Sequence, residues 1–261
     1  MIYDVKNISF TYPSGTDEVF GDISFTLEAG EILCVLGPND AGKSTLMSCM
    51  AGLLKPSRGS ILLEGSEMFS LSRRDIARTV GYVPQSHTPV FGYTVFHFIM
   101  MGRTPHIGVF SRPGPEDEAA ATQALGALSI EHLADRVYTE LSGGERQQAV
   151  IAQALAQRPK VLLFDEPAAH LDYGNQQNIL SLIKKLAAAG FGVIITTHNP
   201  DHALLLGGIT AVMDGEGNFE CGATQEILTE ARLKQVYKTD LRLLFVEELG
   251  RTACLPSGIG N

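Results

Sequence analysis

The chain has 261 residues, a hydrophobic content of 44% and a formal net charge of -9. This length can bury a full core and predicts one domain with a subdomain. The acidic balance argues against nucleic acid as the main partner and against adsorption to anionic lipid, because both depend on Lys and Arg. The four cysteines are widely spaced and form no CxxC pair, so we expect reduced thiols and neither disulfides nor a metal site.

The N-terminus has neither the basic start nor the apolar core of a signal peptide. No uncharged apolar run reaches the roughly 18 residues that a membrane-spanning helix needs. We therefore expect a chain that is itself soluble.

Short apolar runs alternate with helical patterns, which predicts a largely parallel α/β sheet. Four of these runs are nearly continuous in apolar residues, as expected for strands covered on both faces: Ile32–Leu36, Thr79–Val83, Val161–Phe164 and Val193–Thr197. Each is followed by polar candidates, which are the loop Gly37–Thr45, Gln85, the pair Asp165 and Glu166, and His198. Ligands of open parallel sheets bind outside the carboxyl ends of the strands. These polar residues are therefore expected to meet at one edge.

The segment 86–158 differs from its surroundings and is interpreted as an inserted helical subdomain. It contains a Pro/Gly-rich loop at Gly108–Pro115 and then an Ala-rich helical stretch through Leu133. The flanking segments 1–85 and 159–225 are expected to form the α/β core.

The last part of the chain, 226–261, is interpreted as a C-terminal tail. A turn-rich piece, Asp214–Asn218, precedes a predicted helix near Thr224–Tyr237, and the end contains Gly and Pro.

The loop after the first apolar run follows the phosphate-loop pattern G-x-x-x-x-G-K-[ST]. It consists of Gly37, Pro38, Asn39, Asp40, Ala41, Gly42, Lys43, Ser44 and Thr45. The two glycines let the backbone wrap phosphates, the lysine reaches the β- and γ-phosphates, and Ser44 offers a hydroxyl to Mg²⁺. The helix that follows points its positive end at the anion. A Gly-rich turn without function is improbable here, so the loop predicts ATP with Mg²⁺ as the ligand.

Two acids follow the third apolar run. Asp165 is expected to be a Mg²⁺ carboxylate, and Glu166 is expected to be the general base that activates the attacking water. Paired acids at a strand end can also be a solvated turn. The four apolar residues before them and Pro167 after them favour the buried edge of the sheet.

The stretch Leu141–Glu145 reads LSGGE and lies between the phosphate loop and the paired acids. In this position it resembles the signature of ABC-type ATPases. The resemblance covers nearly the whole chain. It implies a P-loop NTPase (RecA-like) fold with a mostly parallel sheet, an antiparallel N-terminal β region and an inserted helical subdomain.

The signature residues Ser142, Gly143, Gly144 and Glu145 also have a physical interpretation. Ser142, Gly143 and Gly144 precede a predicted helix, Glu145–Ala156, and would present free N–H groups at its positive end. The chain already has one anion site at its phosphate loop. A head-to-tail pair of copies, with each signature closing on the other's γ-phosphate, explains the second site.

The resemblance assigns further roles by position. His198 resembles the switch histidine that contacts the γ-phosphate, although a lone histidine in a strand is more often structural. Gln85 resembles the Q-loop glutamine that reaches Mg²⁺ and the attacking water. Tyr12 lies where the family places an aromatic ring that stacks on adenine, and Leu171–Asp172 resembles the D-loop at the dimer interface.

Three positions depart from the family pattern: Asp40, Gln148 and Gln153. The family mostly has glycine in place of Asp40, and we expect its carboxylate to weaken ATP binding without abolishing it. If this position needs a positive φ, Asp is among the better tolerated residues. The other two departures have no interpretation from sequence.

The run Met101–His106, with the residues that lead to Arg136, is similar to ATPase subunits of importers for siderophores, haem and cobalamin, with molybdate-type relatives nearby. This implies a second copy of the chain and a polytopic permease, whose cytoplasmic helix would bind in a groove formed by Gln85–Pro115. It also implies, indirectly, an extracytoplasmic substrate-binding protein. The location would be the cytoplasmic face of the inner membrane. One alternative is a soluble ABC ATPase. Repair types need a longer insertion between Gln85 and Ser142, and translation types carry two ATPase cassettes where this chain has one. The other alternative is a regulatory ATP-binding dimer with weak turnover.

Overall fold

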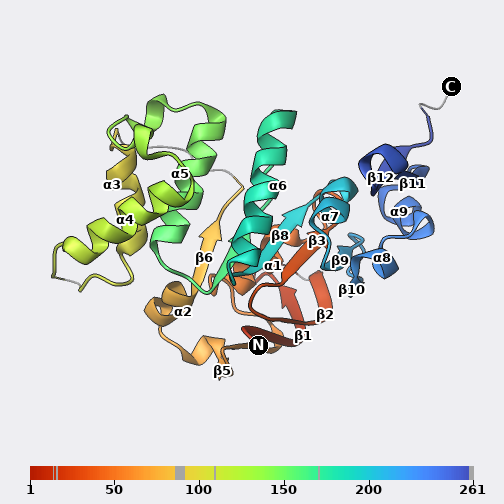
Figure 1. Cartoon of the computed structure of the whole chain (residues 1–261). Coiled ribbons are helices and arrows are strands. Elements are labelled where there is room, and N and C mark those ends of the chain that lie inside the picture. Colours follow the sequence, from red (N-terminus) through yellow and green to blue (C-terminus); the bar gives the residue numbers. More distant parts are fainter. Residues whose placement is uncertain (14, 16, 86–91, 109, 170, 259–261) are drawn as a thin grey trace.

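The computed structural model describes residues 1–258 apart from 14, 16, 86–91, 109 and 170 (Figure 1). A central sheet of six strands has the order β10-β9-β3-β8-β7-β6. Its strands are β3 (Ile32–Leu36), β6 (Val80–Val83), β7 (Val161–Phe164), β8 (Gly192–Thr197), β9 (Ile209–Met213) and β10 (Phe219–Ala223). All neighbours pair in parallel except β9 with β10. The predicted parallel core is confirmed.

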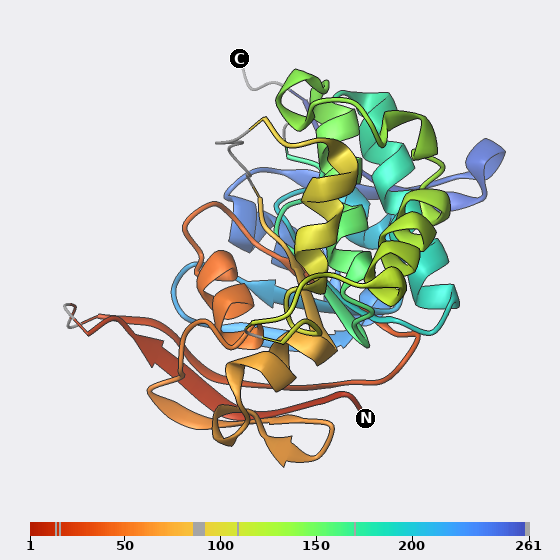
Figure 2. The same cartoon turned by 90° about the vertical axis from the view of Figure 1, so that its left-hand side faces the viewer.

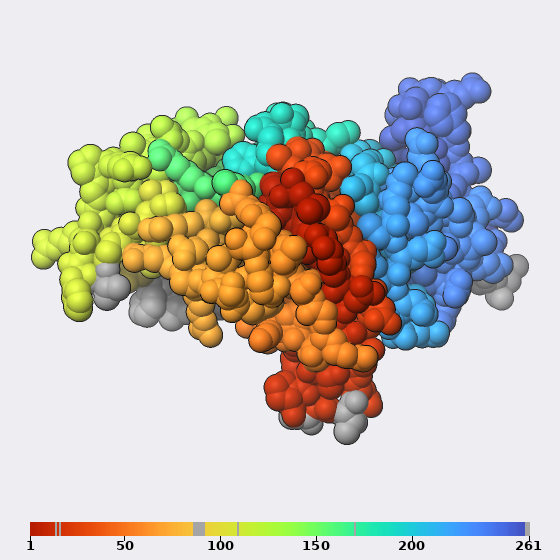
Figure 3. Space-filling view, turned by 90° about the horizontal axis from the view of Figure 1, so that it is seen from below, coloured from red at the N-terminus to blue at the C-terminus, as the bar shows by residue number. Residues whose placement is uncertain are grey.

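A second sheet, β2-β1-β4-β5, is antiparallel and packs below the central one. It contains β1 (Tyr3–Thr11), β2 (Glu18–Leu27), β4 (Arg58–Leu63) and β5 (Ser66–Glu67). The side chains Tyr3, Phe20 and Leu27 are fully buried between the sheets. Figure 3 shows the N-terminal strands crossing the lower face between the helical segment and the C-terminal segment. The expected antiparallel N-terminal region is thus confirmed.

Helices cover the central sheet, and three of them form a group on one side of it (Figures 1 and 2). That group is α3 (Val95–Met100), α4 (Pro115–Ala127) and α5 (Gly143–Ala156). The other α-helices are α1 (Lys43–Met50), α2 (Arg73–Thr79), α6 (Tyr173–Ala188), α7 (Pro200–Leu206), α8 (Thr224–Ile227) and α9 (Glu230–Tyr237). Short 3-10 turns lie at Met68–Ser70, Met101–Arg103, Glu131–Leu133, Tyr138–Glu140 and Glu247–Leu249.

The run Met101–His106 connects the helices of this group. The buried Arg103 donates from Nε to Asp117, 3.0 Å away, and from Nη1 to the carbonyl of Ala156 at 2.9 Å. Gln153 on α5 donates to the carbonyl of Phe98 at 3.1 Å and so joins α5 to α3. A Cβ on Gly102 would lie 2.1 Å from the carbonyl oxygen of Gln153, so only glycine allows this close approach.

Several elements differ from the sequence prediction. The helix expected near Thr224–Tyr237 is two helices, because Thr229 caps a new one by accepting from the N–H of Arg232. Thr79 ends α2 and does not begin β6. The Gly/Pro-containing end forms a two-stranded hairpin, β11 (Leu241–Val246) and β12 (Arg251–Pro256).

Among the described residues, no helix is long and apolar enough to cross a membrane. The four cysteines are free. Burial raises the pKa of the Cys34 thiol to about 12, which keeps it protonated and inert.

Candidate functional site

The phosphate loop joins β3 to α1 through backbone conformations that favour glycine. Gly42, the N-cap of α1, has φ 90° and makes no side-chain cap, which leaves the first-turn N–H groups open to an anion. A Cβ on Gly37 would lie 2.3 Å from the carbonyl oxygen of Met213. Asp40 has φ 65°, so this position does take the left-handed conformation considered from the sequence.

Lys43 is 5% exposed and is held by three oxygens. Its ammonium donates to the carbonyls of Gly37 at 2.9 Å and Pro38 at 2.7 Å, and it pairs with Glu166 Oε1 at 3.0 Å. The positive charge predicted to reach phosphates therefore lies between the phosphate loop and the end of β7.

The carboxylate of Glu166 is shared between Lys43 and His198. His198 Nδ1 lies 2.9 Å from Glu166 Oε2. Burial raises the pKa of Glu166, but the hydrogen bonds and charges of Lys43 and His198 outweigh it, so the pKa lies below its ordinary value. The group is ionised at neutral pH, as a general base must be.

Asp165 is buried and fixed by two hydroxyl groups that the sequence reasoning missed. Thr196 Oγ1 donates to Asp165 Oδ1 at 2.7 Å and accepts from the N–H of Glu166 at 2.8 Å. Tyr82 donates to Asp165 Oδ2 at 3.3 Å. Burial first, and then the Asp165 charge, raise the pKa of the Tyr82 hydroxyl, which stays protonated as a donor. A signal existed, because Tyr82 and Thr196 lie on predicted strands that are followed by the predicted site residues Gln85 and His198.

One pocket of about 590 Å³ collects most of the predicted site residues. Its lining comprises Tyr12, Val19, Asn39, Asp40, Gly42, Lys43, Ser44, Thr45, Gln85, Glu166, Ala169 and His198. Tyr12 reaches the pocket from the N-terminal sheet, and its hydroxyl lies 3.1 Å from that of Thr45. Val19 and Ala169 were not predicted. Four segments that follow strands of the central sheet thus converge at its carboxyl edge, and the N-terminal sheet adds a fifth.

The residues present fit MgATP. The uncapped start of α1, the buried ammonium of Lys43 and the Ser44 hydroxyl suit phosphate and its metal ion. The half-exposed ring of Tyr12 lies at the rim, where a base can stack. No group of three or more His, Cys, Asp or Glu side chains forms a separate metal cage in the described part of the chain.

The signature residues do not line this pocket within the part of the chain that the structure describes. They begin α5, and the helix starts at Gly143, two residues earlier than predicted. The cause is a capping box: Ser142 Oγ accepts from the N–H of Glu145, and Glu145 Oε2 accepts from the N–H of Ser142 at 2.8 Å. One of the predicted free N–H groups, that of Ser142, is therefore used, and those of Gly143 and Gly144 occupy the first turn.

The D-loop ends at Asp172, which caps α6 by accepting from the N–H of Asn175 at 2.9 Å. A Cβ on Gly144 would lie 3.1 Å from the side-chain nitrogen of Asn175. The start of α6 therefore packs against the signature. His170, which precedes this loop, lies outside the described residues.

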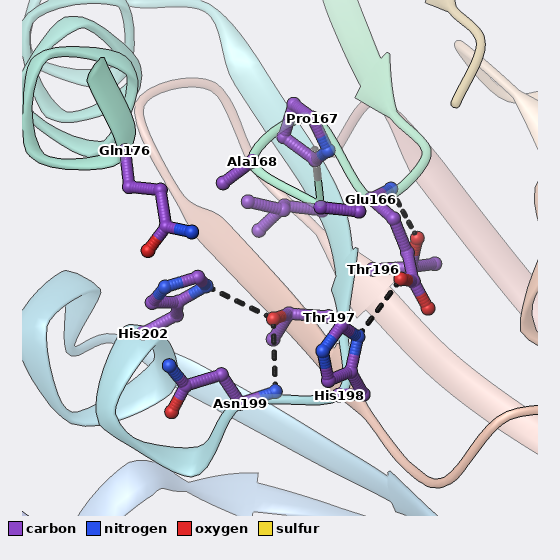
Figure 4. A pocket seen from close by; sticks show the side chains of 11 residues that line it. Glu166, Pro167, Ala168, Gln176, Thr196, Thr197, His198, Asn199 and His202 are labelled. Carbon is purple, nitrogen blue, oxygen red and sulfur yellow. Dashed lines mark hydrogen bonds and ion pairs between the residues drawn. The ribbon is translucent and has the colours of Figure 1, made fainter. Parts of the chain in front are cut away.

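A second pocket lies beside Glu166 and His198, between the ends of β7 and β8 and the helices α6 and α7 (Figure 4). His202 closes it and was missed from sequence. Its Nδ1 lies 3.0 Å from Thr197 Oγ1. Burial, and then the nearby His198, lower the pKa of His202, so this imidazole is neutral at pH 7.

Comparisons with known proteins identify relatives of this chain. The ABC transporter family profile matches residues 20–169. An uncharacterised ABC transporter ATP-binding protein of Haemophilus influenzae is 39% identical over 94% of this chain and 92% of its own. The molybdate import ATP-binding protein MolC of the same organism is 37% identical over 89% of this chain and 87% of its own. The hemin import ATP-binding protein HmuV of Myxococcus xanthus is 37% identical over 89% and 88%.

A solved structure described as an inward-facing metal-chelate type ABC transporter superposes with a TM-score of 0.86 at 34% identity, covering 98% of this chain and 97% of its own. The chain therefore belongs to the ABC transporter family, as one of its ATP-binding subunits and an ATPase.

Proposed function

We propose that this chain is the ATP-hydrolysing subunit of an importer that takes up a metal chelate or a molybdate-type oxyanion. The observation that carries the proposal is the pocket in which Lys43, Glu166 and His198 meet while the signature stands apart from it. A site divided in this way is completed by a second copy. Relatives named for molybdate, hemin and iron chelatin import support the substrate class.

In this proposal each residue keeps the role that its position allows. Lys43 and the first turn of α1 bind the phosphates, and Ser44, Gln85 and Asp165 hold the metal ion. Glu166 accepts the proton of the attacking water, and His198 orients both. When bound, MgATP supplies the phosphoanhydride bond that is broken and a cation that neutralises its oxygens.

The proposed assembly has two copies of this chain on a dimeric polytopic permease at the cytoplasmic face of the membrane, with a substrate-binding protein on the other side. The segments 1–85 and 159–225 form the nucleotide-binding core, 86–158 the helical subdomain that meets the permease, and 226–261 the C-terminal tail. Phe110 in this subdomain is fully exposed, which suits a surface that is covered by a partner. Part of the expected permease surface, 86–91, lies outside the described residues.

Glu166→Gln tests the divided site. The substitution removes the base and keeps the size of the side chain, so MgATP should persist between two copies. Light scattering should show a dimer with MgATP and a monomer without nucleotide. Lys43→Ala is the matched control and should stay monomeric under both conditions. A Glu166→Gln variant that remains monomeric with saturating MgATP would contradict the sandwich.

A measurement of ATP turnover distinguishes the importer ATPase from the alternative of a regulatory dimer. Mg²⁺-dependent phosphate release by the wild type that disappears in Glu166→Gln would exclude a dimer that only binds ATP. If the wild type forms the dimer but does not hydrolyse ATP, the regulatory dimer is favoured.

A further inference from the structure

The C-terminal hairpin is fastened to α7 through a single carboxylate. Arg251 Nη1 on β12 donates to Asp201 Oδ1 at 3.2 Å and to Oδ2 at 3.3 Å, and Nη2 reaches Oδ2 at 3.4 Å. The N–H of Cys254 adds a third donor group, 3.1 Å from Asp201 Oδ1. The carboxylate thus accepts hydrogen bonds from a guanidinium and from a backbone amide. Hydrogen bonds to a charged group belong to the stronger class.

The same helix holds the turn that carries His198. Asn199 Oδ1 accepts from the N–H of Asp201 at 3.0 Å. Thr197 Oγ1 accepts from the N–H of Asn199 at 3.1 Å and lies 3.0 Å from His202 Nδ1. Both neighbours of the switch histidine are therefore attached to α7, as Figure 4 shows for Thr197, Asn199 and His202.

Neither α7 nor the hairpin is expected to hold its place alone. A helix of seven residues is too short to be stable by itself, and a two-stranded hairpin is marginal in water. Each depends on its neighbours for orientation. Asp201 lies in the first turn of α7, nearest to His198, so this contact fixes the end of the helix that matters for the site.

We propose that Arg251 is a positioning residue for ATP hydrolysis: through Asp201 it holds the start of α7 and thereby sets the orientation of His198 toward Glu166. The inference rests on the proposed catalytic role of His198. It gives the C-terminal hairpin a function in the chemical step, although no atom of the hairpin lines the pocket of the phosphate loop among the described residues.

Arg242 is the matched control for this inference. It lies on the same hairpin and carries the same charge, but it pairs with Glu230 at 3.1 Å and Asp240 at 3.9 Å, away from α7. The Arg242 pair is more exposed than the Arg251 pair, and an exposed ion pair contributes little stability. A difference between Arg251→Ala and Arg242→Ala therefore reports the link to α7 and not the general loss of a surface charge.

The experiment measures steady-state ATP hydrolysis and equilibrium ATP binding for the wild type, Arg251→Ala, Arg251→Lys and Arg242→Ala. Arg251→Ala should lower kcat roughly three- to tenfold with the Kd for ATP unchanged, since a positional defect acts on the chemical step. Arg251→Lys should recover part of the loss, and Arg242→Ala should stay within about twofold of wild type. Imidazole NMR should show the His198 resonances shifted in Arg251→Ala only.

The proposal is overturned if Arg251→Ala leaves kcat within twofold of wild type, if it changes the ATP Kd instead, or if Arg242→Ala has the same effect. Thermal melting of each variant identifies unfolding, and if Arg251→Ala does not fold, Arg251→Lys carries the test. Failure of the proposed function gives a different result. In that case the wild type itself would show no ATP turnover that depends on His198.

Discussion

Asp40 gives the sharpest test of how the phosphate loop binds its ligand. It is exposed, lines the pocket and has φ 65°, a conformation that glycine adopts without cost. Two substitutions separate the charge from the backbone effect. Asp40→Asn keeps the shape and the tolerance for a positive φ but removes the charge, and Asp40→Gly removes both.

The exposure of Asp40 sets the expected magnitude. Two like charges near contact in a water-like dielectric repel by about 1 kcal/mol, which corresponds to roughly a fivefold change in Kd. Both variants should therefore bind ATP up to about fivefold more tightly than wild type. Only Asp40→Gly should also raise the free energy of unfolding, by up to about 1 kcal/mol, because it relieves the left-handed backbone.

Calorimetric titration with ATP at about 0.05 M and about 0.5 M salt measures the charge effect, since screening should remove most of it at the higher salt. Urea unfolding of the three proteins without nucleotide measures the backbone effect. The reasoning is refuted if Asp40→Asn binds ATP no more tightly than wild type at low salt.

Three further outcomes follow from the site. Thr196→Val should lower the free energy of unfolding by about 1–3 kcal/mol in urea, because it leaves Asp165 and the N–H of Glu166 without their buried hydroxyl partner; no loss would contradict the bonding seen here. Because the pKa of Glu166 is lowered in the folded state, its stabilisation is complete at neutral pH, above the unfolded-state pKa, and disappears as pH falls through the folded-state pKa. Thermal unfolding of wild type and Glu166→Gln should accordingly converge in acid, and a constant difference would count against this. Gly37→Ala should lower the melting temperature, since its Cβ would strike the Met213 carbonyl, whereas Gly114→Ala, with no atom within 4 Å, serves as the control.

Much of the fold and site could be predicted because the signals are local. The strands β3 and β7 lie at the predicted residues, since a strand buried on both faces is a continuous apolar run bounded by polar residues. The polar residues after the strands met at one edge because parallel strands place their carboxyl ends together.

The rest depends on contacts between distant residues. Asp201 and Arg251 are fifty positions apart, and no spacing rule links a helix start to a hairpin in the tail. The hairpin has no clear strand signal in the sequence, because its strands are mixed in polarity and half exposed. The start of α5 depends on the reciprocal cap of Ser142 and Glu145, for which the pattern S-x-x-E is the local sequence signal.

The importer account is tested most directly by affinity purification of the tagged chain from gently solubilised membranes, with the co-purifying proteins quantified by mass spectrometry. The account predicts a polytopic permease in equal amount, lost in Phe110→Asp and retained in Leu249→Asp, whose exposed side chain lies on the C-terminal hairpin turn. Recovery of the chain alone, or with only soluble partners, would contradict it.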